Sequence, residues 1–304
     1  MTSFYDISKK MLEAIYAKRE LLKEKRTPFT VVACTIFLIG LILSFRQLNI
    51  DLTSLNIWPA LGLFFVMAPL GILYGALGLM LLVHIAGGDK LGLVSSTKIT
   101  AYAQLAEALP LPGGAIVRSA ALVKSGVKTK KSVGLVVATA ILWISMASLG
   151  AGAVLLPQAT PIAYVLLLAG FIGFLPVVFW IYSLSTIGVT AVIIIHRLAG
   201  ILMMALRLFL AFAILKMTVD FPTALFFTFA NIAGTATSLA PAGLGVGELF
   251  AAGMAGLVQM APATAFLAIA LNRILGLASC TLLVGLNSLC DRRGQKSSLM
   301  ENIS

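Results

Sequence analysis

The sequence predicts an all-α polytopic membrane protein, with about six full transmembrane helices and two re-entrant helical hairpins in an inverted repeat. The first observation is composition: the 304 residues are 60% hydrophobic and 11% charged, with a mean hydropathy of +1.04. Such values are typical of chains that cross a membrane several times. The second is that Lys and Arg are clustered at segment ends. The third is a pair of proline- and glycine-rich breaks in apolar surroundings, one in each half, which is typical of transporters built from repeats.

The later break, residues 239–248, reads LAPAGLGVGE. A continuous helix is not expected there, because proline removes a helical donor and each glycine costs about 1 kcal/mol relative to alanine. Within a membrane, irregular backbone persists only where protein or a watery cavity satisfies its polar groups. We therefore expect the tip of a helical hairpin or a gap between two half-helices; a loop outside the membrane is the alternative. Its candidate site residues are Pro241, Gly243, Gly245, Gly247 and Glu248.

The earlier break, residues 109–118, reads LPLPGGAIVR and resembles the later one. It combines prolines with the pair Gly113–Gly114, and a charged residue, Arg118, follows four residues after the pair. Helices starting after Gly114 and after Gly247 would each direct a positive helix end and unpaired N–H groups toward the midplane, which favours phosphate.

The first half of the chain is predicted as follows. Residues 1–26 alternate charged and apolar residues and are expected to form an amphipathic cytoplasmic segment, attracted to anionic lipid. Full spans are expected at 30–45 and 57–85. A hairpin then enters along 99–110 and leaves along 115–123.

The second half is expected to repeat this plan. Full spans are predicted at 133–156, 162–182, 198–217 and 264–286, and the second hairpin enters along 225–240 and leaves along 249–258. Residues 183–195 are apolar but short for a span. We assign them to the cytoplasmic interface, ending at His196 and Arg197, and leave open that they span.

Charge distribution gives the orientation. Residues 1–26 and 89–131 each hold seven Lys or Arg, whereas residues 132–195 hold no charged residue. The positive-inside bias therefore predicts cytoplasmic termini, with the first hairpin entering from the cytoplasm and the second from outside. The expected organisation is a cytoplasmic segment 1–26, a transmembrane transporter-like domain 27–288 and a cytoplasmic tail 289–304. Six or eight ordinary spans remain an alternative.

Five ionisable residues are predicted at membrane depth. Each costs about 2.5–3.5 kcal/mol or more there, so such groups usually face a cavity and a partner. If both carboxylates form ion pairs, one arginine is left for an anionic headgroup, and arginine binds phosphate bidentately. Glu248 is expected to orient one arginine of the neighbouring spans and to leave the other for the lipid. A purely structural Arg–Glu network is the alternative. The five are Glu107, Arg118, Arg207, Glu248 and Arg273.

Two blocks of sequence resemble a known family. The segment 109–127, LPLPGGAIVRSAALVKSGV, and the segment 240–254, APAGLGVGELFAAGM, followed by ALNRI at 270–274, are similar to the two characteristic blocks of the lysylphosphatidylglycerol synthase transmembrane-domain family. The resemblance extends over roughly residues 28–288. It implies a multi-pass bundle that moves lipids between leaflets of a prokaryotic cytoplasmic membrane. We expect no fused synthase domain after these blocks, so the resemblance implies a stand-alone member and does not carry over the lysyl-lipid substrate.

The leading functional hypothesis is therefore a flippase or transporter for an anionic or phosphate-bearing lipid, either a phospholipid or a polyprenyl-linked lipid. The alternatives are a non-transporting membrane partner of a lipid- or glycan-modifying enzyme, and an integral-membrane lipid headgroup enzyme. Residue patterns for a catalytic triad, a metal site, a nucleotide-binding loop or a nucleic-acid-binding domain are absent from the sequence. We expect no enzyme activity, cofactor or nucleic-acid partner, and leave a homo-oligomer open.

Overall fold

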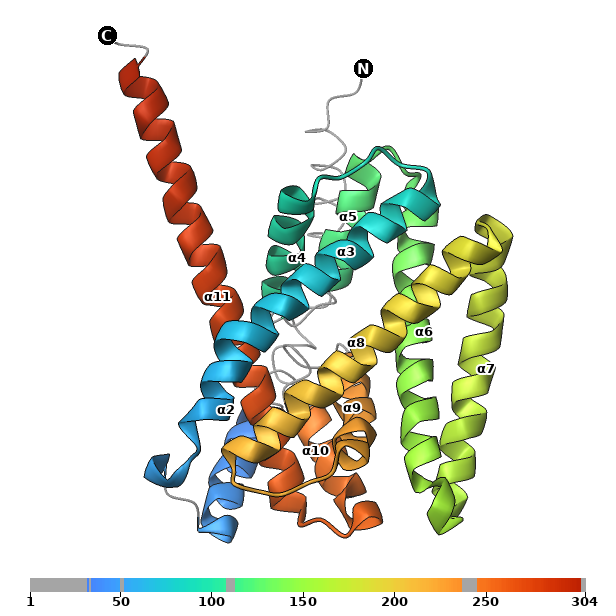
Figure 1. The fold of residues 1–304 in the computed structure, drawn as a ribbon, viewed down its shortest axis with the longest axis vertical. Coiled ribbons are helices and arrows are strands. Elements are labelled where there is room, and N and C mark those ends of the chain that lie inside the picture. Colours follow the sequence, from blue (N-terminus) through green and yellow to red (C-terminus); the bar gives the residue numbers. More distant parts are fainter. Residues whose placement is uncertain (1–31, 33, 50–51, 108–112, 237–244, 302–304) are drawn as a thin grey trace.

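The computed structural model describes residues 32, 34–49, 52–107, 113–236 and 245–301, and all regular structure among them is helical (Figure 1). A helix over Cys34–Leu48 precedes the labelled elements. These are the short helix η1 (Leu52–Ser54), α2 (Ile57–Gly62), the π-helical turn η2 (Leu63–Met67), α3 (Ala68–Ala86), α4 (Leu93–Glu107), α5 (Gly113–Lys124), α6 (Thr129–Leu155), η3 (Leu156–Gln158), α7 (Pro161–Leu184), α8 (Ile187–Ile214), α9 (Phe221–Ala236), α10 (Val246–Met254), η5 (Ala255–Val258) and α11 (Pro262–Glu301).

Five helical stretches of the described chain are long and apolar enough to cross a membrane. They confirm a multi-pass, all-helical protein and overlap five of the predicted spans, although the helix at Ile187–Ile214 begins earlier than the span predicted at 198–217. The first predicted span, 30–45, overlaps the shorter apolar helix Cys34–Leu48. The five stretches are Ile57–Ala86, Thr129–Gln158, Pro161–Leu184, Ile187–Ile214 and Pro262–Leu286.

Residues 187–195 are not separate from the fifth predicted span, because they form the first part of the same helix, α8. Thr186 caps a helix through a hydrogen bond from the N–H of Val189, and α8 then continues without interruption to Ile214. The run of β-branched residues at 192–195 disfavours a helix only slightly, and burial of Thr190 and Ile193 against neighbouring helices outweighs that preference. His196 and Arg197 therefore lie inside a long helix rather than at its end.

Each predicted break separates two helices that pack against each other. The first pair is α4 and α5, and the second is α9 and α10. In Figure 1, α4 and α5 lie in the upper half of the molecule, whereas α9 and α10 lie in the lower half. The exit helices begin slightly earlier than predicted, at Gly113 and Val246. Residues 108–112 and 237–244, including Pro241 and Gly243, lie outside the described part of the chain.

Packing relationships in the two halves correspond. Helix α3 packs on α4 as α8 packs on α9, and α5 packs on α6 as α10 packs on α11. The first helix of each hairpin also contacts the last helix of the other half, α4 against α11 and α9 against α6.

Where α3 and α8 cross, Tyr74 and His196 make matching contacts with the opposite helix. The hydroxyl of Tyr74 donates to the backbone oxygen of His196 (2.8 Å), and Nε2 of His196 lies 3.1 Å from the backbone oxygen of Tyr74. Their rings stack with centroids 4.1 Å apart. Each ring rests on a glycine of the other helix, Tyr74 on Gly200 and His196 on Gly78, where a Cβ would collide with it.

Two large apolar clusters occupy opposite ends of the bundle. One joins α6–α11 through residues such as Phe212, Phe227 and Leu267, and the other joins α3, α5, α6 and α7 through residues such as Leu122 and Leu142. On α8, the second cluster uses Ile193 and the first begins at Leu208. The polar residues described next lie between the two clusters.

Candidate functional site

A polar cavity of about 160 Å³ lies between the hairpins and the long helices. Both hairpins, α3, α6, α8 and α11 contribute to its walls, so residues far apart in the sequence meet there. Four of the five ionisable residues predicted at membrane depth line it, and the fifth, Glu248, is bonded to one of these four. The lining residues are Ala68, Gln104, Glu107, Arg118, Trp143, Met204, Arg207, Asn231, Ile232, Thr235, Asn272, Arg273, Gly276, Leu277 and Cys280.

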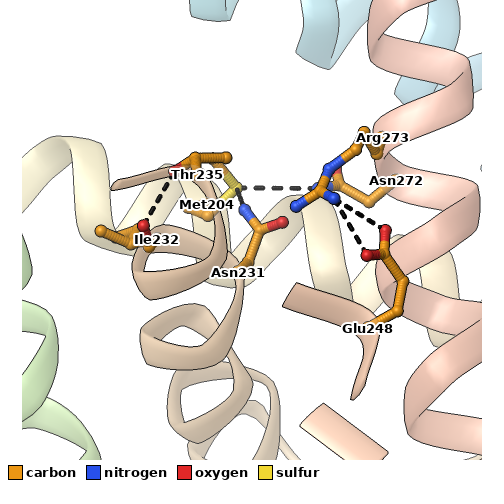
Figure 2. Close-up of polar contacts among 7 residues, drawn as sticks. All are labelled: Met204, Asn231, Ile232, Thr235, Glu248, Asn272 and Arg273. Carbon is orange, nitrogen blue, oxygen red and sulfur yellow. Dashed lines mark hydrogen bonds and ion pairs between the residues drawn. The ribbon is translucent and has the colours of Figure 1, made fainter. Parts of the chain in front are cut away.

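Glu248 and Arg273 form a buried ion pair (Figure 2). Nη1 of Arg273 donates to both carboxylate oxygens of Glu248, at 2.9 and 3.0 Å. Glu248 has no exposed surface and Arg273 is 7% exposed. The carboxylate also lies in the first turn of α10, where the helix dipole favours a negative charge.

The glycines of the later break permit this pairing. Gly245 has a positive φ of 80° and precedes the first residue of α10, a conformation that favours glycine. A Cβ on Gly247 would lie 2.8 Å from Nη2 of Arg273. A Cβ on Gly234 of α9 would collide with the backbone of Gly247. The glycines therefore let α9, α10 and the Arg273 guanidinium approach closely, which explains why glycine precedes the carboxylate.

The first hairpin carries its own ion pair. Nη2 of Arg118, on α5, lies 3.0 Å from Oε1 of Glu107 at the end of α4. A Cβ on Gly113 would collide with the backbone of Ala106, and one on Gly114 would collide with the Glu107 side chain. About a third of each charged side chain remains exposed, 32% for Arg118 and 39% for Glu107. This pair is therefore accessible from the cavity, unlike the buried pair of the second hairpin.

Of the three arginines predicted at membrane depth, Arg207 is the one left without a carboxylate among the described residues. Its Nε donates to Oδ1 of Asn272 (3.0 Å) and its Nη2 to the backbone oxygen of the same residue (3.4 Å). The guanidinium lies between two glycines, since a Cβ on Gly71 would be 3.4 Å from Nη1 and one on Gly276 would be 2.6 Å from Nη2. Among the five predicted residues, three arginines and two carboxylates leave one net positive charge, and the two ion pairs leave it on Arg207.

Uncharged polar side chains complete the cavity wall. Asn231 of α9 and Asn272 of α11 both donate to the sulfur of Met204, at 3.2 and 3.8 Å (Figure 2). Thr235 bonds to the backbone oxygen of Ile232 (2.8 Å). Nε1 of Trp143 is buried and has no acceptor among the described residues. The wall therefore offers hydrogen-bond donors that an anionic ligand can satisfy.

Arg197 is a polar residue of the bundle that was not predicted from the sequence. It was assigned to the end of an interfacial segment, yet it lies within α8, and its Nε is buried without an acceptor among the described residues. Its guanidinium interacts electrostatically with the Tyr74 hydroxyl and with Arg118. Extending the fifth predicted span toward the N-terminus by one further apolar stretch would have placed this residue at membrane depth.

The structure thus brings together the predicted residues Glu107, Gly113, Gly114, Arg118, Arg207, Gly245, Gly247, Glu248 and Arg273, while Pro241 and Gly243 lie outside the described chain. Among the described residues, no group of His, Cys, Asp and Glu has the arrangement of a metal site. No protein-family model, no curated protein and no solved structure matches the chain.

Proposed function

We propose that this protein moves an anionic, phosphate-bearing lipid between the leaflets of a prokaryotic cytoplasmic membrane. The observation that carries the proposal is Arg207, a guanidinium inside the bundle that has no carboxylate among the described residues. Ionisable groups at membrane depth usually have a partner, and a phosphate can supply two acceptor oxygens to one guanidinium. The sequence resemblance to the lysylphosphatidylglycerol synthase transmembrane-domain family supports the same reading.

The arrangement of the other charges favours a headgroup over a purely structural network. Both carboxylates already have arginine partners, so the remaining positive charge is available to a ligand. The unpaired indole N–H of Trp143 and the amides of Asn231 and Asn272 lie in the same cavity wall and can donate to phosphate or glycerol oxygens.

We further propose an inverted-topology repeat of two units, each a long helix, a hairpin and a second long helix. The corresponding contacts of α3–α6 and α8–α11, and the hairpins at opposite ends of the bundle, support this reading (Figure 1). In transporters of this design, the substrate site lies near the midplane between the repeats, and rocking of the repeats exposes it to each side in turn. The polar cavity is lined by residues of both hairpins, which supports this placement of the site.

Reconstitution tests this function. The purified protein is inserted into liposomes that contain trace amounts of fluorescent phospholipids, and an impermeant reagent measures how fast inner-leaflet lipid becomes accessible. We expect accelerated movement of phosphatidylglycerol and phosphatidic acid without any nucleotide, and slower movement of zwitterionic phosphatidylcholine. A folded protein that moves no lipid across a broad panel, including polyprenyl phosphates, but that binds a membrane enzyme would overturn the proposal in favour of the partner function.

A further inference from the structure

A second hollow lies on the outside of the bundle, between the C-terminal half of α3 and the N-terminal half of α8. It has a volume of about 460 Å³. Three of its side chains are well exposed, Leu77 at 45%, Val192 at 47% and Ile195 at 64%. Surface hydrophobic side chains of a membrane protein face lipid, so hydrocarbon can reach this groove. We call it the α3/α8 groove; it is lined by Leu77, Met80, Leu81, Val192, Ile195 and His196.

The stacked pair of Tyr74 and His196 adjoins this groove through His196. His196 lines the groove directly, and its ring lies against Tyr74. The two reciprocal hydrogen bonds hold both rings to the backbone of the opposite helix. Along α8, the groove residue His196 is eight residues from Met204 of the polar cavity, which corresponds to about 12 Å at 1.5 Å per residue.

Arginines adjoin both the groove and the cavity. Arg197 follows His196 in the sequence and interacts electrostatically with Arg118, which lines the cavity. Glu107 is bonded to Arg118, but no carboxylate within ion-pairing distance of Arg197 is found in the described part of the chain. Two neighbouring guanidinium groups with one carboxylate repel each other, and an additional anion between them would relieve this repulsion.

We propose that the α3/α8 groove holds the hydrocarbon chain of a phosphate-bearing lipid whose phosphate binds Arg197 and Arg118, beside the Tyr74–His196 pair. The apolar groove and the adjacent cations match the two ends of such a lipid. The inference rests on the proposed function, because it identifies where the transported lipid enters the bundle from the side. Release of the Tyr74–His196 pair then lets the phosphate pass to Arg207.

Photolabelling in liposomes tests this site. Two probes carry the same diazirine on one acyl chain; one is phosphatidylglycerol and the other is the uncharged diacylglycerol. After irradiation, mass spectrometry compares labelling of the groove segments 77–81 and 192–196 with labelling of the exposed face of α7 between Leu168 and Leu175. We expect the charged probe to label the groove about tenfold more than the uncharged one, a difference of ~1.4 kcal/mol. On α7 the two probes should label equally.

Two variants and two matched controls complete the experiment. Arg197→Gln should bring the groove ratio to about one, whereas Lys130→Gln, which removes an exposed charge from α6, should leave it unchanged. Ile195→Trp fills the groove and should reduce its labelling by both probes, whereas Leu168→Trp on α7 should not. If Arg197→Gln does not fold, the labelling of Ile195→Trp alone tests whether lipid binds in the groove.

Equal labelling by both probes in the parent groove overturns the inference, as does a preference that survives both variants. These results are separable from failure of the proposed function. If the charged probe still labels the groove preferentially but no lipid moves between leaflets, the transport function is rejected and the lipid-binding site is retained. If lipid moves between leaflets but the groove shows no preference for the charged probe, the transport function is retained and the groove is rejected as the lipid-binding site.

Discussion

Glu248 and Arg273, 25 residues apart in the sequence, share a doubly hydrogen-bonded contact in which Nη1 of the arginine lies 2.9 and 3.0 Å from the carboxylate oxygens. The pair joins the exit helix of the second hairpin to the following long helix. Because both residues are buried, each charge depends on the other for its stabilisation. This pairing is the reason that the positive charge left in the cavity belongs to Arg207.

The first prediction concerns that pair. Glu248→Gln and Arg273→Met should each destabilise the protein by about 3–5 kcal/mol, because each leaves one buried charge without its partner. The double variant removes both charges and should unfold at a higher temperature than either single variant in detergent. Additive losses in this double-mutant cycle would contradict direct coupling of the two side chains.

The second prediction concerns the glycine before the carboxylate. Gly247→Ala should lower both the unfolding temperature and lipid movement, because its Cβ would lie 2.8 Å from Nη2 of Arg273. Gly253→Ala, in the same helix, meets nothing within 4 Å and should be neutral or stabilising by up to about 1 kcal/mol, the helix-propensity difference between the residues. Equal behaviour of the two variants in thermal unfolding would argue against a close approach at Gly247.

The third prediction separates the two ion pairs. Because Glu107 and Arg118 are about one-third exposed, breaking their contact should cost no more than about 1 kcal/mol. Arg118→Gln should therefore slow lipid movement with little change in unfolding temperature, whereas Glu248→Gln should change both. A large loss of stability in Arg118→Gln, with unchanged movement per folded molecule, would assign this pair to structure alone.

The fourth prediction concerns orientation. In a background without native cysteines, Gln158→Cys and Gln259→Cys should react with an impermeant maleimide from outside the cell. Lys128→Cys should react only after the membrane is permeabilised. All three positions are exposed in the structure. The expectation follows from the lysines flanking α5 and α6 and the uncharged loops at the opposite ends. External labelling of position 128 would reject the inverted-repeat topology.

Much of the architecture was predictable because its signals are local. Span length and hydropathy identified five helices, and proline with glycine identified the two breaks. The convergence of Arg118, Arg207 and Arg273 on one cavity was also predictable, because charges at membrane depth require polar surroundings. The choice of Arg273 over Arg207 as the partner of Glu248 was not predictable, since it depends on the angle at which α10 meets α11.

Other parts of the site carry no sequence signal of their own. Asn231, Asn272 and Trp143 lie within apolar runs, and only tertiary packing brings them to the cavity. Arg197 was misassigned because the β-branched residues before it favoured a boundary that packing overrides. The pairing of Tyr74 with His196 depends on the crossing of α3 and α8.

Lipid movement by Arg207 variants tests the central claim most directly. In liposomes, Arg207→Gln should reduce phosphatidylglycerol movement by at least about tenfold, because a bidentate charge-assisted contact to phosphate is lost. Arg207→Lys should recover part of the rate, since it keeps the charge but not the planar pair of donors. Lys130→Gln, which removes an exposed charge, should move lipid at the parent rate. If folded Arg207→Gln moves phosphatidylglycerol as fast as the parent protein, the cavity is not the headgroup site.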